Sequence, residues 1–112
     1  MKTMVLLGLL VAGCGGGVGA AGTLVGAACD VDAQCVHRCV RGDSHYPGGI
    51  CSLTCRSDAD CPGGSSCVDD ANGICAVNCL ANDHCAGFGR GFSCDEIDRI
   101  AGGVKATVCR VK

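Results

Sequence analysis

The stretch CRSDADCPGGSSCVDDANGIC, residues 55–75, places four cysteines close together among glycine, proline, asparagine and aspartate. Related groups precede and follow it, and each group opens with two cysteines that five residues separate. These openings are CDVDAQC (residues 29–35), CRSDADC (residues 55–61) and CLANDHC (residues 79–85). Each has Asp or Asn three places after its first cysteine, as Asp32, Asp58 and Asn82. A third and a fourth cysteine complete each group, so twelve cysteines form three repeated units of four.

Cysteine, more than apolar side chains, is expected to stabilise this chain. It has 13 cysteines in 112 residues, a length that allows one domain at most. From Cys29 onward large apolar side chains are few, so burial at about 25 cal/mol per Å² gives little stability. A cysteine content above about 8–10% is typical of disulfide scaffolds in oxidising compartments. We expect a small disulfide-rich fold: three four-cysteine units with short hairpins and turns and little regular secondary structure.

Turn-forming residues indicate the local structure of each unit. The Asp or Asn of the opening segment is expected to cap a short helical turn or to form an Asx-turn. Asn72 and Gly73 favour a primed hairpin turn, while Pro-Gly-Gly at residues 47–49 and Gly-Gly at residues 102–103 mark turns in the other units. In the third unit we expect two strands, over residues 92–97 and 104–111.

The pairing of twelve cysteines is open from sequence alone, because on the order of 10⁴ pairings exist. We prefer a pairing of the first cysteine with the third and of the second with the fourth within each unit. Each such disulfide closes a short loop and contributes roughly 3 kcal/mol to the stability of the fold. The preferred pairs are Cys29 with Cys39, Cys35 with Cys51, Cys55 with Cys67, Cys61 with Cys75, Cys79 with Cys94, and Cys85 with Cys109. Reduction is then expected to unfold the domain.

The N-terminus has the features of an export signal. Met1-Lys2-Thr3 gives a short positive start, and residues 4–13 form an apolar run of h-region length that is too short to span a bilayer. The end of this run, Val11-Ala12-Gly13-Cys14, resembles the lipobox of bacterial lipoproteins. That resemblance implies a diacylglycerol on the sulfur of Cys14, removal of the leader before it, and acylation of the new N-terminus.

The lipobox resemblance also implies how the chain is organised and where it resides. Gly15 follows Cys14, so the resemblance implies lipid anchoring at the bacterial outer membrane or cell surface, with the membrane as partner. The expected parts are a lipoprotein signal peptide (residues 1–13), lipidated Cys14 with a flexible Gly/Ala-rich tether (residues 14–28), and a cysteine-rich domain (residues 29–112). Its units cover residues 29–54, 55–78 and 79–112.

Two other interpretations of the N-terminus remain open. Residues 4–28 are almost free of polar groups and could form an uncleaved helix with small-residue packing, although their many glycines disfavour a helix. Ordinary signal-peptidase cleavage after Val18-Gly19-Ala20 would remove Cys14. All three interpretations export the domain. Only the lipobox gives Cys14 a role, and it leaves an even number of cysteines to pair.

Two further resemblances bear on the cysteine-rich domain. Residues 55–79 resemble the second half of the whey-acidic-protein four-disulfide core, which implies Cys55 with Cys67 but Cys61 with Cys79. Cys67 stands alone where that family has two adjacent cysteines. The whole chain is more similar to the cysteine-rich repeat lipoproteins of myxobacterial type, whose repeats follow a Dickkopf N-terminal-like cysteine pattern. That resemblance implies a surface module without established chemistry.

Candidate sites for chemistry are few. The formal net charge is −2 with no basic stripe, so nucleic-acid binding is not expected. The cysteine gaps differ from those of zinc knuckles, and we expect no metal and no cofactor. Four aspartates lack EF-hand spacing and are interpreted as solvated turn carboxylates: Asp58, Asp60, Asp69 and Asp70. Three histidines are scattered and lack a nucleophile, so no enzyme is expected: His37, His45 and His84.

Two classes of function remain as hypotheses. The first is a non-enzymatic, lipid-anchored, disulfide-stabilised extracytoplasmic structural or binding module, with loops carried on rigid units. The second is a secreted peptidase inhibitor of whey-acidic-protein-like type, in which Arg41 in the long loop of the first unit would enter a protease cleft. Residues 41–43 also read Arg-Gly-Asp, and we treat this adhesion-like tripeptide as a coincidence in a glycine-rich chain.

Overall fold

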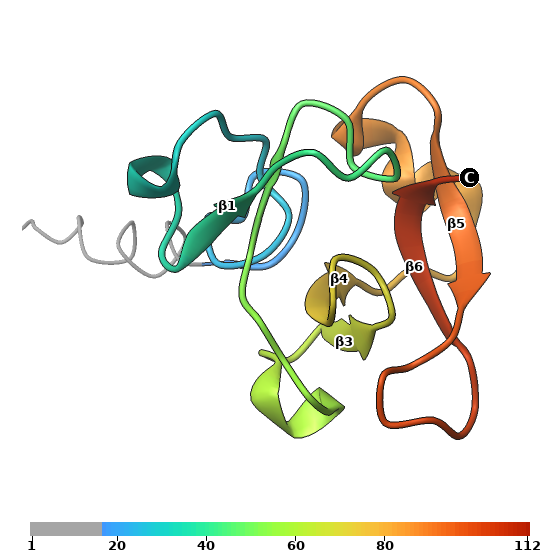
Figure 1. Cartoon of the computed structure of the whole chain (residues 1–112). Coiled ribbons are helices and arrows are strands. Elements are labelled where there is room, and N and C mark those ends of the chain that lie inside the picture. The colour runs from blue at the N-terminus through green and yellow to red at the C-terminus, as the bar shows by residue number, and fades with distance from the viewer. Residues whose placement is uncertain (1–16) are drawn as a thin grey trace, which may run out of the picture.

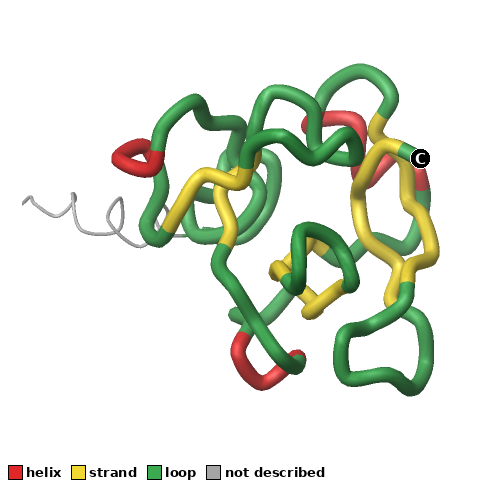
Figure 2. The backbone as a smooth tube through the Cα atoms, in the orientation of Figure 1, coloured by secondary structure: helices red, strands yellow, loops and turns green. Residues whose placement is uncertain are grey.

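Three hairpins, one in each cysteine unit, contain the strands that residues 17–112 form (Figure 1). The computed structural model describes residues 17–112. The antiparallel pairs are β1 (Arg38–Val40) with β2 (Ile50–Ser52), β3 (Ser65–Val68) with β4 (Ile74–Val77), and β5 (Phe92–Ile97) with β6 (Ala106–Val111). A short 3-10 helix precedes each hairpin: η1 (Asp32–Gln34), η2 (Asp58–Asp60) and η3 (Asn82–Phe88). Figure 2 shows that loops and turns make up most of the described chain.

Six disulfides stabilise the three units, and the small disulfide-rich fold class is confirmed. Each disulfide joins cysteines of one unit, the first to the third or the second to the fourth. They are Cys29–Cys39, Cys35–Cys51, Cys55–Cys67, Cys61–Cys75, Cys79–Cys94 and Cys85–Cys109. These are the pairs that we prefer from the spacing. The pairing of Cys61 with Cys79 that the whey-acidic-protein resemblance implies is wrong for this chain, since Cys61 bonds Cys75.

The two disulfides of a unit attach its opening segment to both strands of its hairpin. In every hairpin the third and fourth cysteines lie directly opposite each other: Cys39 and Cys51, Cys67 and Cys75, and Cys94 and Cys109. Opposite residues of an antiparallel pair point to the same face of the sheet. The first and second cysteines therefore reach the same face. Each unit is a helical turn that two disulfides link to one face of a hairpin.

Two expectations about the hairpins are wrong in detail. Val68 pairs with Ile74, so the hairpin loop covers residues 69–73, and its turn is centred on Ala71 and Asn72 and not on Asn72 and Gly73. Both Ala71 and Asn72 have positive φ (48° and 67°), as a primed turn requires, and Gly73 N donates to the carbonyl oxygen of Asp70 at 2.8 Å. The last strand begins at Ala106 and not at Val104, because residues 98–105 form the loop of the third hairpin.

A glycine lies two places before the fourth cysteine in the first two units, where the backbone comes close to the first cysteine. Gly73 has φ +103°, and a Cβ on it would lie 2.6 Å from the carbonyl oxygen of Cys55. Gly49 has φ +104°, and a Cβ on it would clash with the carbonyl oxygen of Cys29. The backbone N–H of each first cysteine donates to this glycine's carbonyl, at 3.1 Å for Cys55 and 3.3 Å for Cys29. Both glycines therefore allow the opening segment to dock on the hairpin.

Residues 17–28 fold against the cysteine units, so the expectation of a flexible tether is wrong for them. Val25 forms a parallel bridge with Val18 and is 0% exposed, packed among cysteines of the second unit. Gly26 N donates to the carbonyl oxygen of Cys51 at 2.9 Å, and Cys51 N donates to that of Ala27 at 2.8 Å. The small residues serve close packing here, since a Cβ on Gly26 would clash with Gly19. Cys14 and residues 1–13 lie outside the described residues.

One apolar cluster draws on all three units. A buried β-branched residue precedes the fourth cysteine of every unit, and these residues are Ile50, Ile74 and Val108. Val40 and Val68, which follow the third cysteine of the first two units, pair with Ile50 and Ile74 and join the same cluster. The units thus pack against one another through a small shared core. No helix formed by residues 17–112 has the length and apolar character needed to cross a membrane.

Candidate functional site

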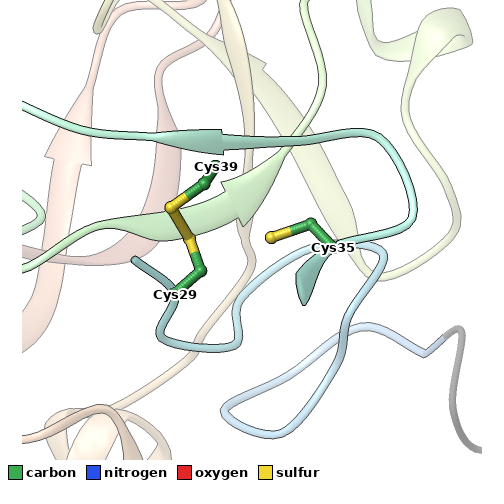
Figure 3. Close-up of side chains that lie close together, drawn as sticks. All are labelled: Cys29, Cys35 and Cys39. Atoms are coloured by element: carbon green, nitrogen blue, oxygen red, sulfur yellow. A yellow bond between two sulfur atoms is a disulfide. The ribbon is translucent and has the colours of Figure 1, made fainter. Parts of the chain in front are cut away.

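We define the knuckle of each unit as the segment from its first to its second cysteine, residues 29–35, 55–61 and 79–85. Figure 3 shows Cys29 of the first knuckle bonded to Cys39, with Cys35 beside this disulfide. The sulfur atoms of Cys29, Cys35 and Cys39 lie close enough together to hold a metal ion, as do those of the first three cysteines of the second unit and those of the first, second and fourth cysteines of the third. All of these sulfurs are bonded in disulfides and offer no thiolate, which is the form that binds zinc.

The repeated Asp or Asn of each knuckle binds the hairpin and does not cap the helical turn. Its Oδ1 atom accepts a hydrogen bond of 2.9 Å from the backbone N–H of the third cysteine in every unit. These bonds join Asp32 with Cys39, Asp58 with Cys67 and Asn82 with Cys94. None of the residues that precede η1, η2 and η3 makes a side-chain cap. The expected cap or Asx-turn is therefore wrong for these residues, because their Oδ1 atoms bond an amide 7 to 12 residues further along the chain and fix the knuckle beside the first disulfide.

A second repeated contact within the knuckles was not expected from the sequence. The residue before the second cysteine accepts a hydrogen bond from the backbone N–H of the residue after the first cysteine. The acceptors are Gln34 for Asp30 (2.5 Å), Asp60 for Arg56 (2.9 Å) and His84 for Leu80 (3.1 Å). Because an amide, a carboxylate and an imidazole nitrogen are all acceptors, the repeat conserves a chemical role without conserving a residue type. The pattern is visible in the sequence only once the contact is known.

A buried polar cluster of Tyr46, Asp70, Asp95 and Arg110 joins the three units. Arg110 on β6 donates to both carboxylate oxygens of Asp70, from Nε at 3.0 Å and from Nη2 at 3.0 Å. Its Nη1 donates to Oδ2 of Asp95 at 2.6 Å, and the hydroxyl of Tyr46 donates to Oδ2 of Asp70 at 2.9 Å. Tyr46, Asp70 and Arg110 are only 1%, 7% and 8% exposed. The cluster is a bidentate charged pair, in which Asp70 has Tyr46 as a further partner and Arg110 has Asp95.

The surroundings of this cluster shift two pKa values. Burial, followed by the negative charge of Asp70 and the hydrogen bond to it, raises the pKa of Tyr46 far above its ordinary value of 10.0. Burial disfavours the charge on Arg110, but the hydrogen bonds to Asp70 and Asp95 outweigh it and raise the pKa of Arg110. Tyr46 is therefore neutral and Arg110 charged throughout the ordinary pH range. Neither group changes its charge in that range, as is expected of a cluster that connects the units structurally.

This cluster was not expected from the sequence, and the expectation for one of its members is wrong. Asp70 is buried and triply hydrogen bonded, so its interpretation as a solvated turn carboxylate is wrong. The other three aspartates of that group lie apart from it: Asp69 is exposed, Asp58 pairs with Arg99 at 2.9 Å, and Asp60 bonds its own knuckle. A usable signal was Asp95, which follows the third cysteine where the first two units have valine.

The long loop of the first unit, residues 41–49, is bonded to the third unit. The backbone N–H of Val111 donates to the carbonyl oxygen of His45 at 2.9 Å, and His45 Nδ1 lies 2.6 Å from the carbonyl oxygen of Val111. Asp43, His45 and Asp70 bring three possible metal ligands within 4.8 Å of one another. Because both oxygens of Asp70 already bind Arg110, a cation there would have to displace a buried guanidinium.

Arg41, the residue expected to act in a peptidase inhibitor, is exposed at the start of this loop. Its Nη1 donates to the carbonyl oxygen of Asp30 at 3.1 Å, and Gly42 has φ +86°. Asp43, the last residue of the Arg-Gly-Asp tripeptide, accepts a bond from the backbone N–H of His45 at 2.8 Å. The side chains of Arg41 and Asp43 are thus both bonded within the first unit.

Comparison with protein-family models, with curated proteins and with solved structures finds no match to this chain. The function proposed below therefore depends on the residues and the geometry of the chain itself.

Proposed function

We propose that this chain is a non-enzymatic structural or binding module of a bacterial envelope, anchored in the membrane by lipid on Cys14. Its six disulfides indicate an extracytoplasmic location, because such bonds persist in oxidising compartments. In this proposal residues 1–13 act as a lipoprotein signal peptide, and the chain is displayed at the outer membrane or the cell surface. The lipid bilayer is its first partner.

The observation that carries the proposal is the complete pairing of the cysteines from Cys29 to Cys109. Each of these twelve cysteines is bonded inside its own unit, so none of them is available to bond Cys14. A thirteenth cysteine that directly follows Val11-Ala12-Gly13 then needs another role. Acylation supplies one, and two acyl chains are enough for stable anchoring at about 0.8 kcal/mol per buried methylene.

The polar side chains of the cysteine-rich domain support a structural role over a catalytic one. Tyr46, Asp70 and Arg110 bond one another in a buried cluster, and His45 and His84 bond backbone groups. A nucleophile or general base must be able to reach a substrate. In the described part of the chain these groups instead hold loops and units together, which suits a rigid carrier of surface loops.

Intact mass of the full chain, produced in a Gram-negative bacterium and extracted from its membranes with detergent, tests the proposal. We expect a chain that begins at Cys14, carries a diacylglyceryl group and an N-acyl group, and lacks the twelve hydrogens that six disulfides remove. The control variant Cys14→Ala is expected to carry no acyl group while keeping all six disulfides. A membrane-extracted chain with unmodified Cys14, or one that begins after Ala20, would contradict the proposal.

The peptidase-inhibitor hypothesis has its own test. The bonds of residues 41–49 to Val111 and Asp30 hold that loop within the fold, and the side chain of Arg41 would have to leave Asp30 to enter a protease pocket. Titration of trypsin-like proteases with micromolar protein is expected to leave their activity unchanged. Stoichiometric inhibition that the variant Arg41→Ala abolishes would favour the inhibitor over the structural module.

A further inference from the structure

The reach of the chain between Cys14 and the folded body is short. The carbonyl oxygen of Gly17, the first described residue, accepts hydrogen bonds from Leu24 N (3.1 Å) and Val25 N (3.3 Å). Three peptide units join Cys14 to Gly17, and they span at most about 11 Å at full extension. The headgroup region on one side of a bilayer takes up about 5–7 Å of that length. A lipid on Cys14 therefore keeps Gly17 within a few ångströms of the headgroup surface.

The surface of the N-terminal segment around Gly17 suits contact with a membrane. No charged residue occurs in residues 17–28, where the chain consists of Gly, Ala, Val, Leu and Thr. Ala20 and Ala21 are exposed at a turn closed by the bond from Gly22 N to the carbonyl oxygen of Gly19 (3.0 Å). Placing such a surface against headgroups costs no desolvation of charge.

The loops that contact this segment are uncharged at their points of contact in all three units. In the first unit, Val36 N donates to the carbonyl oxygen of Thr23 at 2.9 Å, and the side chain of Val36 is 55% exposed. In the second unit, a Cβ on Gly64 would lie 3.6 Å from Val18. In the third, a Cβ on Gly87 would lie 3.1 Å from the Cβ of Ala20.

We propose that the face formed by Ala20, Ala21 and Val36, with the adjoining residues of the N-terminal segment, rests on the lipid surface to which the chain is anchored. This inference rests on the proposed lipid anchor and adds an orientation to it. Residues 17–28 pack against the cysteine units and bond them. The lipid anchor is therefore attached directly to the folded body and not through a long flexible linker. The third-hairpin loop, residues 98–105, lies far from the N-terminal segment in Figure 1 and then points away from the membrane.

Tryptophan fluorescence in vesicles tests this orientation. The chain contains no tryptophan, so one introduced residue reports its own position. The acylated protein carrying Val36→Trp or Ala21→Trp is reconstituted in phosphatidylcholine vesicles that contain a nitroxide-headgroup lipid. Val104→Trp is the matched control, because Val104 is 82% exposed and lies in the loop of residues 98–105. Quenching of both test variants is expected to exceed that of Val104→Trp at least about twofold, as contact with the headgroup region requires.

The outcomes separate this inference from the anchor on which it depends. Each variant is first checked by intact mass for acyl groups and for six disulfides. Acylated protein with equal quenching at all three positions, or with the strongest quenching at residue 104, would overturn the orientation and leave the anchor standing. Absence of acyl groups from the unsubstituted chain would overturn the anchor and the orientation together. The Ala21→Trp variant keeps the test decisive if Val36→Trp fails the disulfide check.

Discussion

At the scale of single residues, Asp95 shows how one exchange alters a repeat. It occupies the position that Val40 and Val68 hold in the first two units, opposite Val108 on β6. A carboxylate at the edge of a shared core is costly unless it is paired, and Arg110 pairs with it and with Asp70. The sequence shows the exchange of valine for aspartate. It does not show the partners, because Asp70 and Arg110 are 40 residues apart along the chain.

The substitution Asp70→Asn tests whether the polar cluster contributes to stability. The amide removes the negative charge that faces Arg110 and leaves Asp95 as its only carboxylate partner in the cluster. We expect a loss of about 2–3 kcal/mol in the free energy of unfolding, measured by guanidinium denaturation with the disulfides intact. The matched control Asp69→Asn, at an exposed neighbour, is expected to change it by less than about 0.5 kcal/mol. Equal effects of the two substitutions would refute a structural role for the cluster.

The raised pKa of Tyr46 predicts how the free energy of unfolding depends on pH in the alkaline range. Burial, then Asp70, raises the pKa of Tyr46 in the folded chain above 10.0, its ordinary value. The contribution of the neutral phenol is fully present below pH 10 and is lost as the pH rises through the folded pKa. Above pH 10 this loss amounts to about 1.4 kcal/mol per pH unit, because the unfolded chain ionises first.

Comparison with Tyr46→Phe isolates this dependence from other alkaline effects. The difference in unfolding free energy between the two proteins is measured at several pH values, with intact disulfides verified by mass at each. The advantage of tyrosine is expected to be constant up to about pH 9 and to shrink beyond about pH 10. A difference that stays constant through that range would show that Tyr46 is not held neutral by the fold.

At the scale of elements, the knuckle and the hairpin were predictable because their determinants are local. Glycine, asparagine and aspartate at fixed distances from cysteines indicated both, and the disulfides pair cysteines only 10 to 24 residues apart. The direction of the Asp32, Asp58 and Asn82 side chains was not predictable, because each bonds a backbone amide of the following strand. An aspartate near a helical turn has the same sequence signature whether it caps that turn or binds elsewhere.

Two substitutions at Asp32 test the knuckle contact. Asp32→Asn keeps an Oδ1 acceptor for the backbone N–H of Cys39, as Asn82 does for Cys94 in the third unit. It is therefore expected to change the free energy of unfolding by less than about 0.5 kcal/mol. Asp32→Ala removes the acceptor from a partly buried amide and is expected to cost about 1 kcal/mol. The account of the knuckle would be wrong if both variants lost the same stability, since charge and not hydrogen bonding would then matter.

At the scale of the whole molecule, the sequence indicated the three units but not how they fit together. Composition could not separate a flexible glycine-rich tether from a closely packed segment, because glycine serves both purposes. In residues 17–28 close packing prevails, as the contacts of Gly26 with Gly19 and of Val25 with the second unit show. The placement of Tyr46 against Asp70 and of His45 against Val111 depends on contacts between units that no single repeat encodes.

Six covalent bonds in place of a large core remain the central claim about this molecule, and reduction tests it most directly. The measurement is the dispersion of backbone amide signals in NMR spectra before and after complete reduction and blocking of the thiols. The oxidised protein is expected to show dispersed signals and no reactive thiol from Cys29 to Cys109, and the reduced protein to collapse to the narrow spectrum of an unfolded chain. A fully reduced protein that kept its native dispersion would contradict the account.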